Sequence, residues 1–257
     1  MDIKDFFPEN EQPLDRLVED GGFCSIFRTF ACVGDSLSSG EFQIPRNDGS
    51  EKKWSYYDMF EYSWGQFMAR TLGSKVYNFS KGGMTAKQYL QSFADSKGFW
   101  NVDLKCQAYI IALGVNDIFN QHMELGTVED IKEDWHDNAP TFAGNYGAIV
   151  QRYKAISPDA KFFFVTPPRD AKPAWTEGGK RIADLLYTLA EHFPNAYVID
   201  LHRYAPVYDE EFRAKFFLHG HMNPMGYVLT AKMMMSYIDY IIRHNMEDFG
   251  RLGLVKH

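Results

Sequence analysis

The 257-residue sequence lacks several features that would assign it to a specialised class of protein. Its three cysteines lie far apart, at positions 24, 32 and 106, so neither a disulfide framework nor the paired spacing of a zinc site is present. Its net charge of −7 argues against nucleic acid or an anionic membrane as a partner, because both favour a basic surface. No apolar run approaches the roughly 20 residues that a membrane-spanning helix needs. We therefore expect a globular protein whose partner is a small molecule.

The amino terminus also lacks the basic segment and apolar core of a signal peptide, so the cytoplasm is the expected compartment. Residues 1–24 are polar and contain Pro8 and Pro13, which predicts an arm that packs over the edge of the protein. The sequence shows no internal repeat and no linker rich in proline or serine. A single domain over residues 1–257 is therefore expected, and the sequence does not indicate its oligomeric state.

Apolar runs of strand length alternate with helical segments along the chain. Five short runs that end at turn residues predict strands at 26–33, 75–79, 108–113, 161–165 and 197–199. Helices are expected within 56–72, 85–93, 142–153, 182–189 and 227–241, in most of which apolar residues recur at helical spacing. The alternation predicts an α/β protein in which a mainly parallel five-stranded sheet lies between two layers of helices, a three-layer α/β/α sandwich.

The first predicted strand ends abruptly in the sequence Gly34-Asp35-Ser36-Leu37. In an open parallel sheet, ligands bind just beyond the carboxyl ends of the strands. A serine at that point, beside a glycine that allows a sharp turn, is a candidate nucleophile. Because such a turn is also common in ordinary loops, the interpretation depends on what the other strand ends carry.

The next two strands end near Gly83 and Asn116, which should therefore lie at the same edge of the sheet as Ser36. The backbone N–H groups of Ser36 and Gly83 and the side-chain amide of Asn116 can all donate to a carbonyl oxygen that becomes negatively charged. Glycine suits the middle position because a side chain would hinder the approach of the backbone donor. These three residues are the predicted oxyanion hole.

A serine nucleophile needs a base, and His221 is suitably placed to be one. It precedes the last predicted helix, for which Asn223 is a good N-cap and Pro224 a good first residue. Its imidazole could take the proton of Ser36 and return it to the leaving group. His219 and His221 form a pair, but two imidazoles without a third ligand make a poor metal site, so no metal is expected.

Four segments of the chain together resemble a known family. Gly34 to Leu37, Asn78 to Thr85, Gly114 to Asp117 and His221 to Pro224 resemble the four motif blocks of the SGNH/GDSL hydrolase superfamily, in the family's order. The resemblance implies the flavodoxin-like SGNH-hydrolase fold and ester hydrolysis without a cofactor. By matching residues it implies Ser36 as nucleophile, His221 as base, and Gly83 and Asn116 in the oxyanion hole. Members include carbohydrate acetylesterases, lysophospholipases, thioesterases and arylesterases, so the substrate does not follow.

The chain departs from the family's pattern at one position. The family usually carries an aspartate three residues before the histidine, and that position is Leu218 here. Leucine cannot accept the imidazole N–H, and loss of the carboxylate from a Ser-His-Asp system typically costs about 10⁴ in rate. Three explanations stay open: a carboxylate from elsewhere, a backbone carbonyl that orients His221, or a slow or inactive protein. The acidic residues nearest in sequence are Asp200, Asp209, Glu210 and Glu211.

The sequence therefore predicts a serine esterase that works through an acyl-enzyme intermediate. The polar segment 41–53 and an aromatic content of 16% favour an O-acetyl or other short acyl ester on a carbohydrate as substrate. Segments 41–53 and 120–140 are expected to be loop insertions near the active-site edge. The alternatives are a lysophospholipase or thioesterase of the same superfamily, and a non-catalytic ligand-binding protein that has lost the triad carboxylate.

Overall fold

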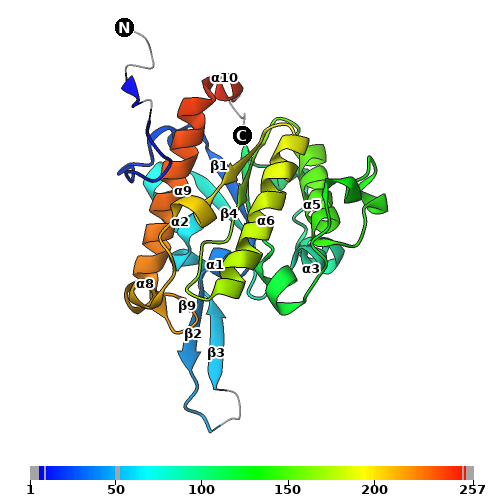
Figure 1. Ribbon diagram of the computed structural model, residues 1–257. Helices are drawn as coiled ribbons and strands as arrows, with labels where there is room; N and C mark the ends of the chain where they lie inside the picture. Colours follow the sequence, from blue (N-terminus) through cyan, green and yellow to red (C-terminus); the bar gives the residue numbers. More distant parts are fainter. Residues whose placement is uncertain (1–5, 9, 50–52, 251, 253–257) are drawn as a thin grey trace.

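A five-stranded parallel sheet forms the centre of the computed structural model, which describes residues 6–8, 10–49, 53–250 and 252 (Figure 1). In spatial order the strands are β4 (Lys75–Ser80), β1 (Thr29–Gly34), β5 (Ala108–Ala112), β6 (Lys161–Val165) and β7 (Ala196–Ile199). Counted along the chain this is the flavodoxin-like order 2-1-3-4-5. The predicted fold class is confirmed. The order reverses between β1 and β5, which is where such sheets bind their ligands.

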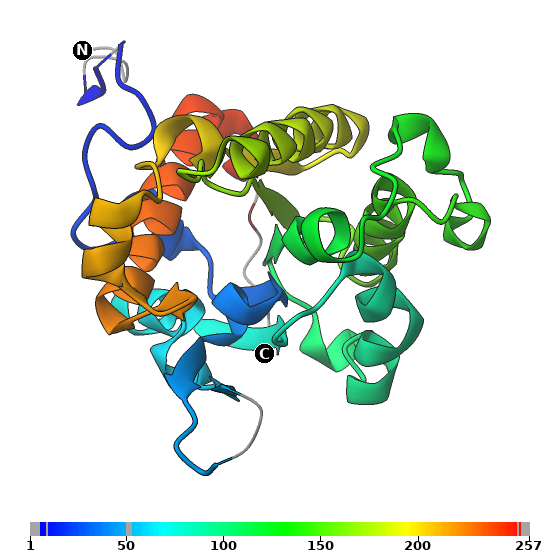
Figure 2. The ribbon, with the colours of Figure 1, turned by 60° about the horizontal axis from the view of Figure 1, so that its bottom comes forward.

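Helices cover both faces of the sheet (Figures 1 and 2). One face carries α2 (Trp64–Leu72), α7 (Leu201–Tyr204), α8 (Glu210–Phe216), α9 (Pro224–His244) and α10 (Met246–Phe249). The other carries α3 (Ala86–Gln88), α4 (Ala94–Lys97), α5 (Phe142–Ile156) and α6 (Pro173–His192). The four-residue helix α1 (Ser36–Ser39) follows β1 directly. None of the helices in the described part of the chain is long and apolar enough to cross a membrane.

Short elements complete the chain. Two antiparallel hairpins pair β2 (Glu41–Pro45) with β3 (Trp54–Asp58) and β8 (Phe217–Leu218) with β9 (His221–Met222). The 3-10 turns are Gly22–Ile26, Phe60–Tyr62, Val102–Leu104, Val128–Asp130 and Trp135–Asp137, and π-helical turns occupy Tyr89–Phe93 and Asn116–Asn120.

Alternate residues of β1 enter two separate hydrophobic cores, because successive side chains of a strand point to opposite faces. Phe30 and Cys32 pack with the residues of α2 and α9, whereas Ala31 and Val33 pack with those of α5 and α6. All four are fully buried. A strand buried on both faces has to be apolar throughout, which is why the run was recognisable in the sequence.

The structure corrects three expectations about local structure. Segment 41–53 was expected to be a loop, yet 41–45 forms β2, and residues 50–52 lie outside the described part. The helix expected over 56–72 begins only at Trp64, after the Ser63 hydroxyl accepts a hydrogen bond from Gln66 N and caps it. The helix expected over 85–93 is divided among α3, a π-helical turn and α4. Segment 120–140 is irregular as expected, with two 3-10 turns.

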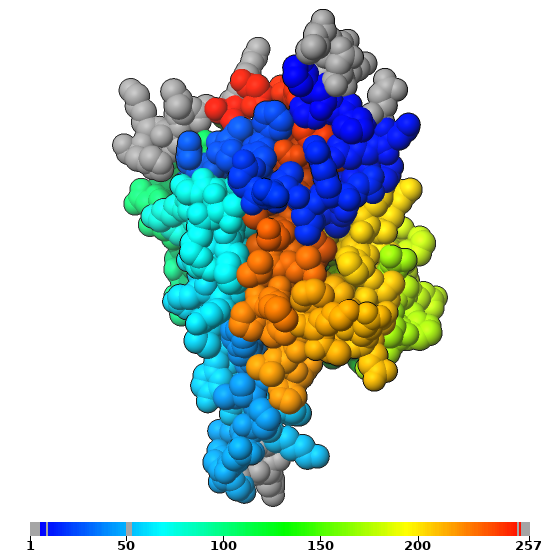
Figure 3. Space-filling model, turned by 90° about the vertical axis from the view of Figure 1, so that its left-hand side faces the viewer, coloured from blue at the N-terminus to red at the C-terminus, as the bar shows by residue number. Residues whose placement is uncertain are grey.

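The described part of the 1–24 segment packs along α9, as expected of an arm. Figure 3 shows it in dark blue across the upper end of α9, which is orange to red. The backbone N–H of Val18 donates to Ser236 Oγ (2.9 Å), and Arg243 Nη1 lies 2.6 Å from the Glu11 carboxylate. Two contacts more than 200 residues apart in sequence therefore tie this segment to the last long helix.

Candidate active site

The nucleophile candidate lies at the switch point of the sheet. β1 ends at Gly34, and the Asp35 carboxylate accepts a hydrogen bond from Leu37 N (3.1 Å) and so caps α1. Ser36 is the first residue of α1 and is half-buried at the carboxyl edge of the sheet, which Figure 2 turns toward the viewer. Within the described residues its hydroxyl makes no hydrogen bond, so the oxygen is available to a ligand.

Asn116 follows β5 and reaches the same turn. Its Nδ2 donates to Asp35 Oδ2 and to the Met84 carbonyl oxygen, both at 3.2 Å, while its Oδ1 accepts from Asn120 Nδ2 at 2.6 Å. Both hydrogens of the amide are therefore engaged, and one of these long bonds has to be exchanged before Asn116 can donate to a substrate. Burial is the main reason that the pKa of the Asp35 carboxyl rises to about 6.

Gly83 lies in a turn from Lys81 to Met84, closed by a hydrogen bond from Met84 N to the Lys81 carbonyl (3.2 Å). Its φ of 71° is in the left-handed region that glycine adopts without strain. A Cβ on Gly83 would meet no described protein atom within 4 Å, so the positive φ is the feature within the protein that favours glycine here. The close approach is at Gly82, where a Cβ would collide with the Glu41 carboxylate.

His221 reaches the site from the β8–β9 hairpin. Asn223 and Pro224 begin α9 as predicted: the Asn223 side chain accepts from Gly226 N, and Pro224 is the first helical residue. The imidazole is largely buried and contacts two side chains of β2. Its Nε2 lies 3.0 Å from Glu41 Oε1, and its Nδ1 lies 3.3 Å from Gln43 Oε1.

The contacts with Gln43 and Glu41 place an oxygen against each imidazole nitrogen of His221, and the neutral ring has a single N–H to donate. Gln43 Oε1 accepts a hydrogen bond from the backbone N–H of Gly220 (2.8 Å), so the amide presents its oxygen to this corner. This oxygen can accept from Nδ1, just as Glu41 Oε1 can accept from Nε2. In the tautomer that donates from Nδ1 to Gln43, the free lone pair is on Nε2, as in a Ser-His-Asp triad.

None of the four acidic residues nearest in sequence contacts His221. Asp200 accepts from Thr166 Oγ1 (3.0 Å) and from the Tyr187 hydroxyl (2.9 Å). Asp209 caps α8, Glu211 pairs with Lys215, and Glu210 is exposed in the first turn of α8. Leu218 pairs with His221 across the hairpin, where the family's aspartate would stand. The carboxylate that does contact the imidazole, Glu41, lies 180 residues away in sequence.

One cleft of about 570 Å³ brings the candidate residues together. Ser36, Asn116 and His221 line it, and Gly83 is not among its lining residues. On another wall the rings of Phe119 and Trp175 stack at 4.3 Å between centroids and 8° between planes. The cleft thus combines a hydroxyl, an imidazole and an amide with an aromatic surface.

Asp117 is a structural partner of the site. Its carboxylate accepts from Ala86 N, at the start of α3 and 31 residues earlier in the chain, at 2.9 and 3.1 Å. The side chain is fully buried, and burial is the main reason that its pKa rises from 3.8 to about 7. Asp117 therefore ties the Asn116 turn to the segment that follows Gly83.

Asp117→Asn is expected to flatten the dependence of stability on pH. Because the pKa of Asp117 is higher in the folded state than its usual 3.8, the folded protein binds more protons between about pH 4 and 7, and stability falls as the pH rises through that window. Asparagine keeps an oxygen for Ala86 N but does not ionise. It should therefore remove a pH-dependent contribution to the free energy of unfolding on the order of a few kcal/mol. Urea unfolding at pH 5 and pH 8 gives the free energy of unfolding of each protein at each pH. The same change in that free energy between the two pH values in wild type and Asp117→Asn would contradict the assignment.

These features define a class of protein. It has a flavodoxin-like sheet with serine, histidine and asparagine side chains around a cleft at the switch point of the sheet. Residues 32–229 match the family model described as GDSL-like lipase/acylhydrolase. That match covers most of the sequence, and the chain belongs to this family. The resemblance drawn from the four motif blocks is thereby confirmed.

Solved structures with the same fold are distant in sequence. A family two carbohydrate esterase from Clostridium thermocellum in complex with cellohexaose is 15% identical, with a TM-score of 0.57 over 86% of this chain and 65% of that one. A family 3 carbohydrate esterase from the same organism is 14% identical (TM-score 0.54; 84% and 97%), and a protein from Lactobacillus plantarum is 16% identical (TM-score 0.58; 83% and 97%). No curated protein matches the chain in sequence.

Proposed function

We propose that the protein hydrolyses carboxylic esters through an acyl-enzyme formed on Ser36, with His221 as the base. Family membership supports this proposal, and so does the cleft that Ser36 and His221 share. The observation that carries it is the Gly220–Gln43–His221 chain of contacts, because Gln43 can accept the Nδ1 proton and so free the Nε2 lone pair to act as the base. Gln43 thus takes the orienting role that Leu218 cannot perform.

In the proposed reaction, Nε2 of His221 removes the Ser36 proton as the serine oxygen bonds to the ester carbonyl carbon. The imidazole becomes positively charged, and Glu41 Oε1, 3.0 Å from Nε2, offsets that charge. Before the proton transfer the Nε2 lone pair accepts from the Ser36 hydroxyl. After the transfer the new Nε2 proton can be donated to Glu41. Nε2 then protonates the leaving alcohol, and a water activated by the same nitrogen releases the acid.

The oxyanion formed in each step would be held by the backbone N–H groups of Ser36 and Gly83 and by Asn116 Nδ2. Such donors typically contribute about 3–4 kcal/mol each to transition-state stabilisation. Asn116 can supply its share by exchanging its 3.2 Å bond to the Met84 carbonyl for one to the oxyanion. No metal or cofactor is needed for this chemistry.

The preferred substrate is a short acyl ester on a carbohydrate. The stacked rings of Phe119 and Trp175 give the cleft a flat apolar wall, which suits the face of a sugar ring. Two carbohydrate esterases are among the proteins of the same fold. A lysophospholipase or thioesterase and a non-catalytic binding protein are the alternative functions.

A fluorophosphonate probe tests the proposal directly, since it labels only an activated serine hydroxyl. We expect the label on the peptide that contains Ser36, together with hydrolysis of p-nitrophenyl acetate that the probe abolishes. Heat-denatured protein is the control and should take up no label. An unlabelled Ser36 in a protein that also leaves the ester intact would favour the binding-only alternative.

A further inference from the structure

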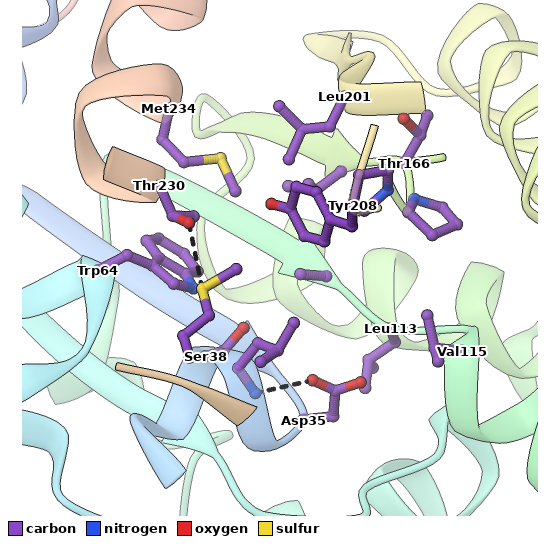
Figure 4. Close-up of a pocket in the computed structure, with 16 residues that line it drawn as sticks. Asp35, Ser38, Trp64, Leu113, Val115, Thr166, Leu201, Tyr208, Thr230 and Met234 are labelled. Atoms are coloured by element: carbon purple, nitrogen blue, oxygen red, sulfur yellow. Dashed lines mark hydrogen bonds between the residues drawn. The ribbon is translucent and has the colours of Figure 1, made fainter. Parts of the chain in front are cut away.

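A second and smaller cavity lies beside the turn that carries Ser36 (Figure 4). It has a volume of about 80 Å³ and lies between the carboxyl ends of β5 and β6 on one side and α9 on the other. Most of its lining is apolar and includes Leu37, Trp64, Ala112, Leu113, Val165 and Met234. The sheet and α9 therefore enclose an apolar space next to the nucleophile.

This small cavity adjoins the larger cleft. The two share six lining residues: Asp35, Leu37, Val115, Pro167, Pro168 and Tyr208. Asp35 and Leu37 are the chain neighbours of Ser36, so the boundary between the two spaces lies next to the candidate nucleophile. A group attached to the carbon that Ser36 attacks would therefore start beside the small cavity, while the rest of the ester stays in the cleft.

Most polar groups of the lining have partners within the protein, but Ser38 Oγ is buried and has none among the described residues. Thr230 Oγ1 donates to the Gly226 carbonyl (2.9 Å), Thr166 Oγ1 donates to Asp200 (3.0 Å), and the Asp35 carboxylate accepts from two donors. A water in a cavity needs two to four polar partners, and Ser38 Oγ by itself supplies fewer than that. A sugar ring would bring several hydroxyls to that single oxygen, whereas each methylene placed there would improve binding by about fourfold.

We propose that this cavity binds the acyl chain of the ester, with the alcohol part in the larger cleft, and that butanoyl to hexanoyl chains fit it best. The inference rests on the proposed function, because it places the acyl group that Ser36 would carry. A space of about 80 Å³ exceeds the needs of an acetyl methyl group but cannot hold the chain of a long-chain lipid. The cavity therefore sets the chain length that the site accepts.

Two variants change the cavity in opposite directions. Ala112→Leu adds three carbons to its lining, and Met234→Ala widens it on the side of α9. In wild type we expect kcat/KM for p-nitrophenyl esters to rise from acetyl to hexanoyl and to fall sharply at dodecanoyl. Ala112→Leu should lower the hexanoyl-to-acetyl ratio at least tenfold, and Met234→Ala should move the optimum to longer chains. Met235→Ala is the matched control, because Met235 is equally buried in α9 but lies against Gly21, away from the cavity.

A binding measurement separates this inference from the proposed function. Hexanoate titrated into wild type by calorimetry should bind at least tenfold more tightly than acetate, and Ala112→Leu should lose that advantage. If no ester is hydrolysed while this binding pattern holds, the proposed function fails and the acyl subsite stands. If esters are hydrolysed with the same chain-length ratios in wild type, Ala112→Leu and Met234→Ala, or if dodecanoyl is best in wild type, the acyl subsite is overturned and the esterase stands.

Discussion

Ser36→Ala is expected to lower kcat for p-nitrophenyl acetate by roughly 10⁶-fold, the scale seen when a serine hydrolase loses its nucleophile. Alanine removes the only atom that could bond to the carbonyl carbon, yet it fits the first turn of α1 without steric cost. Binding and the remaining oxyanion donors should leave a residual rate of roughly 10³–10⁴ over the uncatalysed reaction. The loss should therefore appear in kcat with KM almost unchanged.

Ser39→Ala is the matched control for this variant. Ser39 lies in the same short helix, and its hydroxyl donates to the Asp58 carboxylate and also lies 3.1 Å from the Ser36 carbonyl oxygen. Removing it should lower the melting temperature but keep kcat within about tenfold of wild type, because a typical intramolecular hydrogen bond contributes only about 1 kcal/mol. Equal hydrolysis by wild type and Ser36→Ala would rule out an acyl-enzyme on this residue.

Much of the fold could be predicted from sequence because the central strands are buried on both faces. Phe162 to Phe164, for example, are all fully buried in β6, and a strand in that position has to be a continuous apolar run. Ser36, Asn116 and His221 could be named for a related reason. Ser36 and Asn116 each follow an apolar run that predicts a strand, and His221 precedes a helix with a clear N-cap. The sequence around each residue therefore shows where in the fold that residue lies.

Glu41 and Gln43 could not be found in the same way. Both lie in β2 and point toward His221, with exposed fractions of 9% and 8%, so the buried face of this strand is its polar one. Period-two alternation is interpreted on the assumption that the apolar side faces inward, and here that assumption fails. Their partner, His221, is about 180 residues away in sequence. Local sequence patterns do not indicate contacts between residues so far apart.

Gln43→Met is expected to lower kcat by about 10²–10⁴-fold, because methionine has nearly the same length but cannot accept the Nδ1 proton of His221. The imidazole is then free to take the tautomer with the proton on Nε2, which cannot act as base toward Ser36. KM should change little, since Gln43 does not line the cleft. Gln43→Glu keeps an acceptor for both Gly220 N and Nδ1 and should retain activity, which separates orientation of the base from packing of the strand.

Leu218 provides the decisive rescue for that variant. It pairs with His221 across the β8–β9 hairpin, and side chains directly opposite in such a pair have Cβ atoms about 5 Å apart, within reach of a carboxylate. Adding Leu218→Asp to Gln43→Met should therefore raise kcat at least tenfold above that of Gln43→Met alone. Adding Leu218→Asn, whose amide is both donor and acceptor, should raise kcat less. Full activity in Gln43→Met, or a loss confined to KM, would show that another group sets the tautomer of His221. A rescue by aspartate at 218 would show that the acceptor on Nδ1 is what the reaction requires, whichever strand supplies it.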